Sequence, residues 1–135
     1  MLTQKYVNKI AYDIVGCAIE VHKHLGPGLL ESVYESCMLD EIGDKYSVQK
    51  QVVLPVLYKG RNLGKILKLD LVVEHLVIVE LKAVDVLHPV FKAQLLTYLK
   101  LTNLPKGLLI NFNCDNITKS VVPLVTEEFS KLPKE

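Results

Sequence analysis

The sequence predicts an α/β fold in which a mixed β-sheet is flanked by helices. Apolar residues follow a helical period over residues 7–42 and 89–102, whereas over residues 48–84 they alternate or run almost without interruption. The chain has 135 residues, of which 50% are hydrophobic and 23% charged, which is enough to bury a core without disulfides or structural zinc. No repeat or polar linker divides it, so residues 1–135 are expected to form one domain.

Two helices are expected first. The first buries apolar residues at helical spacing and stops at Gly26-Pro27-Gly28. Its apolar positions are Val7, Ile10, Ile14, Cys17, Val21 and Leu25. The second helix follows at once, from Leu29 to about Ile42. It is expected to bury Leu30, Val33, Tyr34 and Cys37.

Three strands are expected next, beginning at Val48. One face of the first strand carries Val48, Val52, Leu54, Val56 and Tyr58. Pro55 cannot donate a ladder hydrogen bond, so this strand should lie at a sheet edge or contain a bulge. The other two strands, about Gly64 to Val73 and Leu76 to Val84, should form a hairpin with its turn at Glu74-His75.

A third helix and two strands complete the predicted order. Pro89 suits the first turn of a helix that runs to about Thr102. A short buried strand is expected over residues 107–112 and another over residues 120–124. Because a strand reached through a helix is often parallel to its neighbour, the sheet should be mixed.

Four charged residues interrupt the apolar hairpin of residues 65–84. Its odd-numbered positions are all apolar and should define a core face, whereas Lys68, Asp70, Glu80 and Lys82 lie on the opposite face among apolar residues. Burying a charge in a strand that is covered on both faces is costly unless the charge is paired or binds a metal. These four residues therefore require a structural or a chemical explanation.

The register of the hairpin decides between these explanations. Matching the two apolar faces requires paired residue numbers with an even sum, because a slip by one residue turns every side chain over. Sums of 148 and 152 pair Lys68 with Glu80 and Asp70 with Lys82, respectively, as structural ion pairs. A sum of 150, which a three-residue loop gives, places Asp70 opposite Glu80 and Lys68 opposite Lys82. Opposed like charges destabilise a sheet unless a divalent cation such as Mg²⁺ lies between the carboxylates.

Spacing alone leaves three interpretations open. A structural ion pair is favoured over a metal site, and a solvated outer face is the third alternative. In the metal-site interpretation, Lys82 stands two residues from Glu80 on the same face. Its ammonium could then orient a metal-bound water or stabilise charge on a phosphate.

Longer sequence motifs resemble a known family. Asp70, followed after an apolar run by Glu80-Leu81-Lys82, resembles the motif of the PD-(D/E)XK nuclease superfamily. Residues 28–34, GLLESVY, resemble the signature of the GxxExxY family, a small group assigned to that superfamily. The phrases EVHKHLGPGLLESVYE, YKGRNLG, VIVELKAV and AQLLTYLK resemble it as well. The resemblance extends from about Ile10 to Phe112.

The resemblance implies a restriction-endonuclease-like αβββαβ core and a single nuclease-like domain. It also implies metal-dependent hydrolysis of phosphodiester bonds in DNA or RNA. The metal, Mg²⁺ or Mn²⁺, would be held by Asp70, Glu80 and the main-chain carbonyl of Leu81. Lys82 would assist the attacking water. One departure is that Lys68 stands where a similar phrase has arginine, which keeps the charge but loses the bidentate fork.

Two helical residues would complete the site by the same resemblance. Similar nucleases place a helical glutamate at the metal edge, which corresponds to Glu31; a favourable placement near the helix dipole explains this acid equally well. Gln94 and Tyr98 resemble a Q-x-x-x-Y element that faces the active site in related nucleases. Without the resemblance, Tyr98 would be expected in the core and Gln94 at its boundary.

Composition constrains the partners. With 16 basic and 15 acidic residues the net charge is only +1, so contact with nucleic acid has to be local. Lys59, Arg61, Lys65 and Lys68 precede Asp70 without an intervening acid. They form either a phosphate track or the exposed rim of a hairpin, and the rim is favoured for Lys59 and Lys65.

Further expectations concern location and assembly. No apolar run approaches the roughly 20 residues of a membrane span, and no secretory signal is recognisable, so a cytoplasmic protein without membrane contact is expected. A symmetric homodimer is compatible with the small size of the chain, which offers little surface to hold a duplex, but no sequence pattern supports one. The alternatives to a nuclease are a non-catalytic nucleic-acid or protein binding module that retains the fold, and a structural subunit.

Overall fold

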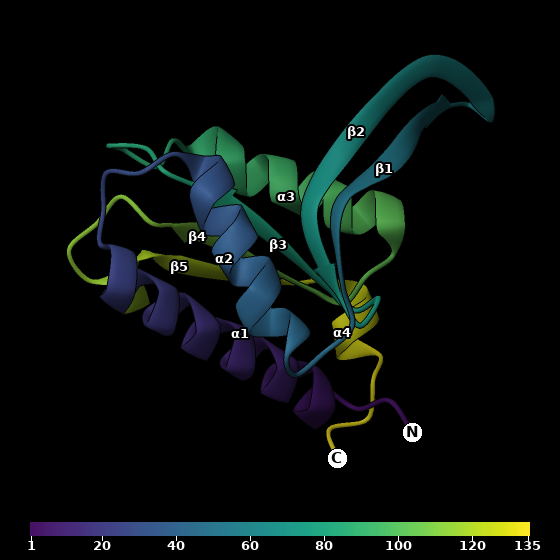
Figure 1. The fold of residues 1–135 in the computed structure, drawn as a ribbon. Coiled ribbons are helices and arrows are strands. Elements are labelled where there is room, and N and C mark those ends of the chain that lie inside the picture. The colour runs from purple at the N-terminus through teal and green to yellow at the C-terminus, as the bar shows by residue number, and fades with distance from the viewer.

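The computed structural model describes residues 1–135 as a five-stranded mixed sheet between helices (Figure 1). Strand order in the sheet follows the sequence, β1-β2-β3-β4-β5. Only β3 and β4, which α3 connects, are parallel, and this confirms the predicted α/β class. No helix is both long and apolar enough to cross a membrane. The elements are α1 (Gln4–Leu25), α2 (Glu31–Gly43), β1 (Val48–Tyr58), β2 (Arg61–Val73), β3 (Val77–Lys82), α3 (Pro89–Thr102), β4 (Lys106–Asn111), the 3-10 helix η1 (Ile117–Ser120), β5 (Val121–Val125) and α4 (Glu127–Ser130).

Helices α1 and α2 cover one face of the sheet (Figure 1). Tyr34 of α2 is completely buried and stacks on Phe112, with 4.5 Å between the ring centroids. Its hydroxyl donates to the Gly26 carbonyl at 2.6 Å and accepts from the Leu29 amide at 3.2 Å. Tyr34 therefore fixes the loop between the helices and, with it, the position of Glu31 at the start of α2.

Helix α3 covers the other face. Its core side chains Leu95 and Leu99 lie so close to β4 that a Cβ on Gly107 would be 3.0 Å from Leu99 Cδ1. The helix begins with Pro89, as predicted, and ends at Asn103, which adopts a left-handed conformation with φ 57°. Because both faces are covered, β3 is buried over nearly its whole length, which explains its almost continuous apolar sequence.

The expected buried face of the second helix is partly wrong. Leu30 precedes the helix in an extended conformation and is 74% exposed, and Val33 is 38% exposed. The core-facing positions are instead Tyr34, Met38 and Ile42, which are four residues apart and form one stripe on α2. The helix begins two residues later than predicted, so Leu30 lies outside its first turn.

The hairpin of β2 and β3 has the register in which residue numbers sum to 150. Leu71 pairs with Val79 and Val73 with Val77. The turn has left-handed conformations at both Glu74 and His75, with φ of 53° and 54°. This three-residue loop excludes both registers that would give structural ion pairs within the hairpin.

The expected single core face of β2 is also wrong. Leu71 and Val73 pack beneath α1 and α2, whereas Leu67 and Leu69 pack against the core on the α3 side. The change occurs where Gln51 of β1 adopts a left-handed conformation with φ 49°. Strand pairs flank this position, but none joins Gln51 to Asp70. The ribbon of β1 and β2 bends here, and its outer part leaves the body of the protein (Figure 1).

The prediction for Pro55 is confirmed. Strand β1 is the edge strand of the sheet, and its register against β2 shifts between Pro55 and Leu57. The extra residues of β2 at this shift include Gly64, whose φ of 72° suits glycine. The shift increases the curvature of the outer ribbon.

Candidate functional site

Strands β2 and β3 separate beyond the Leu71–Val79 pair, and Asp70 and Glu80 lie at this fork. In place of a further ladder bond, Asp70 Oδ2 accepts a hydrogen bond from the Leu81 amide at 2.9 Å. The amide and carbonyl of a strand residue point to the same edge of the strand. The Leu81 carbonyl is therefore directed to the gap that β2 leaves.

Glu80 is a buried acid, and one of its carboxyl oxygens has no hydrogen-bond partner. Its side chain is 6% exposed, and Oε1 has no partner. Burial, followed by the nearby Asp70 carboxyl, raises the pKa of Glu80 to about 9, although the Lys82 ammonium acts in the opposite direction. The protonated form of Glu80 is thus favoured at neutral pH. A cation beside it would favour the charged form.

Two further acids approach the fork from α2. Burial raises the pKa of both Glu31 and Glu35, and the Asp70 charge raises both further. For Glu31 the Lys82 ammonium acts in the opposite direction. Nowhere in the structure, however, do three or more His, Cys, Asp or Glu side chains converge closely enough to hold a metal ion. The acids gather around the fork without forming a closed set of ligands.

Gln51 connects two of these acids. Its Nε2 donates to Glu35 Oε2 at 2.9 Å and to Asp70 Oδ1 at 3.4 Å. Together with the bond from the Leu81 amide, this gives both Asp70 oxygens a donor. The left-handed backbone of Gln51 and the missing strand pair opposite Asp70 make room for this contact.

Lys82 and helix α3 form the other side of the fork. Lys82 Nζ lies 4.4 Å from the centroid of the Phe91 ring, within cation–π range, and makes no ion pair. Burial and then the Glu80 and Asp70 charges raise the pKa of Tyr98, and the nearby Gln94 side chain acts in the opposite direction. Tyr98 is therefore a core residue whose hydroxyl is near the acids, whereas Gln94 is exposed.

Comparison with known proteins decides the family. The profile of the PD-(D/E)XK nuclease superfamily matches residues 8–122. The chain belongs to this superfamily. No curated protein and no solved structure matches it. The matched range includes β1–β4 and the two acids of the fork, and the mixed sheet with flanking helices agrees with the restriction-endonuclease-like fold.

PD-(D/E)XK nucleases generally use divalent metals. The donor set at the fork fits such an ion in one respect, because Glu80 Oε1 is buried beside a second carboxylate and lacks any donor. Divalent cations such as Mg²⁺ bind carboxylate and carbonyl oxygens, which are the groups that Asp70, Glu80 and Leu81 supply. Glu31 is partly buried and does not join Asp70 and Glu80 in a closed set of ligands, and Gln94 is at the surface.

Three residues that the structure places around the fork were not indicated by the sequence analysis. Glu35 lies one turn after Glu31, and Phe91 lies three residues before Gln94, so helical spacing could have indicated both. No sequence signal indicates Gln51. It is an ordinary glutamine in a strand, and only the structure reveals its left-handed backbone.

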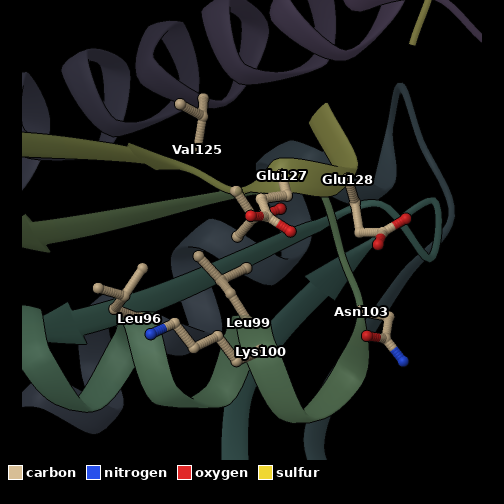
Figure 2. Close-up of a pocket in the computed structure, with 8 residues that line it drawn as sticks. Leu96, Leu99, Lys100, Asn103, Val125, Glu127 and Glu128 are labelled. Carbon is tan, nitrogen blue, oxygen red and sulfur yellow. The ribbon is translucent and has the colours of Figure 1, made fainter. Parts of the chain in front are cut away.

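The main surface cavities of the PD-(D/E)XK domain lie away from the fork. One cavity of about 450 Å³ lies between the C-terminal half of α3 and the segment from β5 to α4. Figure 2 shows Leu96 and Lys100 of α3 on one side of it and Glu127 on the other. Neither acid of the fork lines this cavity.

Proposed function

We propose that this protein is a metal-dependent phosphodiesterase of the GxxExxY type that hydrolyses bonds in DNA or RNA. One observation carries the proposal: Asp70 and Glu80 meet at the fork, and the buried Glu80 Oε1 has no donor. Neither acid is locked in an ion pair with a lysine. Two neighbouring carboxylates without a basic partner repel each other unless a proton or a cation lies between them.

In this proposal, the oxygen atoms at the fork would bind the metal ion. Asp70, Glu80 and the Leu81 carbonyl would hold Mg²⁺ or Mn²⁺, with Glu31 on the outer side. When bound, such an ion lowers the pKa of a water molecule and polarises a phosphate oxygen.

Lys82 provides the positive charge of the proposed site. Its ammonium lies over the Phe91 ring and near Glu80, without forming an ion pair with an acid. From this position it would orient the water and stabilise the negative charge that develops on the phosphate. Exposed Gln94 would contact the substrate at the rim of the fork.

A second candidate is a binding module that keeps the fold without catalysis. The observation in its favour is that no three acidic, histidine or cysteine side chains converge as metal ligands. Such a module would use the same fork and its surroundings to bind nucleic acid or protein.

Cation titration separates the two candidates. We expect Mn²⁺ to raise the melting temperature of the wild-type protein, because a ligand at about 100 times its Kd adds about 2.7 kcal/mol of stability. Asp70→Asn should abolish this gain. In parallel, wild-type protein should cleave a mixture of nucleic acids in Mn²⁺, and Lys82→Ala should not.

Two results would contradict the nuclease proposal. Melting that is unaffected by millimolar cation would favour the binding module. Equal cleavage by wild-type protein and by Lys82→Ala would point to a contaminating nuclease.

A further inference from the structure

The outer part of β1 and β2 forms a projecting ribbon, here called the basic arm and defined as residues 52–69. It begins at the bend beside Gln51 and curves away from the helices (Figure 1). Its tip is a tight turn in which Tyr58 pairs with Arg61, and Lys59 and Gly60 have φ of 50° and 76°. At about 3.3 Å per residue, the tip lies roughly 30 Å along β2 from Asp70.

The arm belongs to the most strongly charged segment of the chain. Residues 45–69 contain six of the sixteen basic residues and none of the fifteen acidic ones, so this segment carries +6 and the rest of the chain carries −5. The basic residues within the arm are Lys59, Arg61, Lys65 and Lys68, and none of them makes an ion pair. A near-neutral protein thus presents a local site of the kind that phosphates require.

The arm also exposes apolar surface that the fold does not use. Val53, Leu57, Tyr58 and Ile66 are each more than half exposed, between 54% and 59%. Lys59 Nζ lies 5.4 Å from the centroid of the Tyr58 ring, so an aromatic ring and two cationic side chains form the tip. Exposed apolar side chains with basic neighbours on one projecting element are compatible with contact to a macromolecule.

We propose that the basic arm lies in the major groove of double-stranded DNA and positions the DNA backbone at the fork. This inference rests on the proposed function and names its substrate class. A major groove about 12 Å wide admits a two-stranded ribbon, whereas the deep and narrow major groove of RNA duplexes does not. Because the ribbon is curved, its length of roughly 30 Å sets an upper limit of about nine base-pair steps between the tip and the fork. Contact between the arms of two copies is disfavoured, because two arms of the same charge repel each other.

Binding can be measured without cleavage in an Asp70→Asn background, in which the side-chain oxygen can still accept the bond from the Leu81 amide. In this background we compare Lys59→Gln/Arg61→Gln/Lys65→Gln with a control of equal charge change, Lys5→Gln/Lys23→Gln/Lys119→Gln. All six side chains are exposed, so both sets should fold. Fluorescence anisotropy with labelled DNA duplexes gives the Kd at salt concentrations of about 50 to 200 mM.

The arm substitutions should weaken binding at least tenfold at about 50 mM salt and reduce the slope of log K against log salt by about 2.7, because each phosphate contact contributes about 0.9. The control should leave the slope unchanged. A duplex of about 20 base pairs reaches from the fork to the tip and should bind more tightly than one of about 6.

Several results would overturn the inference. These are equal affinity and slope for the arm and control variants, absence of any binding, or tighter binding of single strands or duplex RNA. A wild-type dimer that the arm substitutions dissociate, measured by sedimentation, would assign the arm to a second copy instead. Arm-dependent binding without cleavage by the wild-type protein would contradict only the nuclease proposal. Cleavage that the arm substitutions leave unchanged would contradict only the role of the arm.

Discussion

Glu80 is the residue whose ionisation the fold opposes most. Its pKa is raised from 4.5 to about 9, mainly by burial. Between these values the folded protein keeps a proton that the unfolded chain has lost. Stability should therefore fall as pH rises through this window, by up to about 1.4 kcal/mol per pH unit from this group.

Glu80→Gln tests this linkage. The amide has no charge to desolvate, so the variant should lose this part of the pH dependence and exceed the wild-type protein in stability at pH values of about 8. Urea unfolding in the presence of a chelator, from about pH 5 to pH 9, measures the effect. A wild-type protein whose stability follows that of Glu80→Gln across the whole range would show that Glu80 is already ionised at neutral pH.

Some residues of the candidate site could be predicted from the sequence, and others could not. The spacing and the resemblance together identified Asp70, Glu80 and Lys82, and the structure places all three at the fork. Spacing alone favoured an ion pair, which the observed register excludes. Gln51 could not be predicted, because its role depends on a left-handed backbone that its residue type disfavours.

Among the elements, the turn between β2 and β3 determines the register and thereby the site. Ser47 holds Glu74 in this turn, since its amide donates to Glu74 Oε2 at 2.7 Å. His75 has no such contact and still adopts a left-handed conformation. Both residues therefore have a left-handed backbone, but only the side chain of Glu74 is fixed by a hydrogen bond to a residue outside the turn.

His75→Gly should stabilise the protein by about 1 kcal/mol, because glycine adopts this conformation without the penalty that a Cβ imposes. Glu74→Gly relieves similar strain but removes the acceptor for Ser47, so its gain should be smaller or absent. Thermal unfolding of both variants measures the difference. A larger gain for Glu74→Gly than for His75→Gly would contradict this account of the turn.

The elements were largely predictable from periodicity. All three long helices and all five strands occur near the expected residues, and the parallel pair of β3 and β4 follows from the helix between them. The bend of the β1–β2 ribbon was not predictable, because alternation continues through it in the sequence. Leu69 and Leu71 share a parity but pack on opposite sides of the sheet.

At the scale of the whole molecule, hydrogen bonds connect the N-terminal and C-terminal segments of the chain. Figure 1 shows the N- and C-termini next to each other. Gln4 Nε2 donates to the carbonyls of Phe129 and Leu132 at 3.2 Å and 3.1 Å, and the Gln4 amide donates to the Pro133 carbonyl at 2.8 Å. The start of α1 therefore holds the segment that follows β5.

Gln4→Ala should lower the free energy of unfolding by about 1 to 2 kcal/mol, because two partly buried carbonyls lose their donor. Lys5→Ala is the matched control, since its side chain is exposed and only its backbone joins the C-terminal segment. Chemical denaturation of both variants measures the change. Equal stability of the two variants would show that the backbone bonds alone hold the ends together.

The separation of charge between residues 45–69 and the remainder has a consequence for motion in solution. A molecule with a positive projection and a negative body is an electric dipole, although its net charge is only +1. Near any polyanion it experiences a torque that turns the projection forward. Its orientation is thus selected during approach, before the first contact is made.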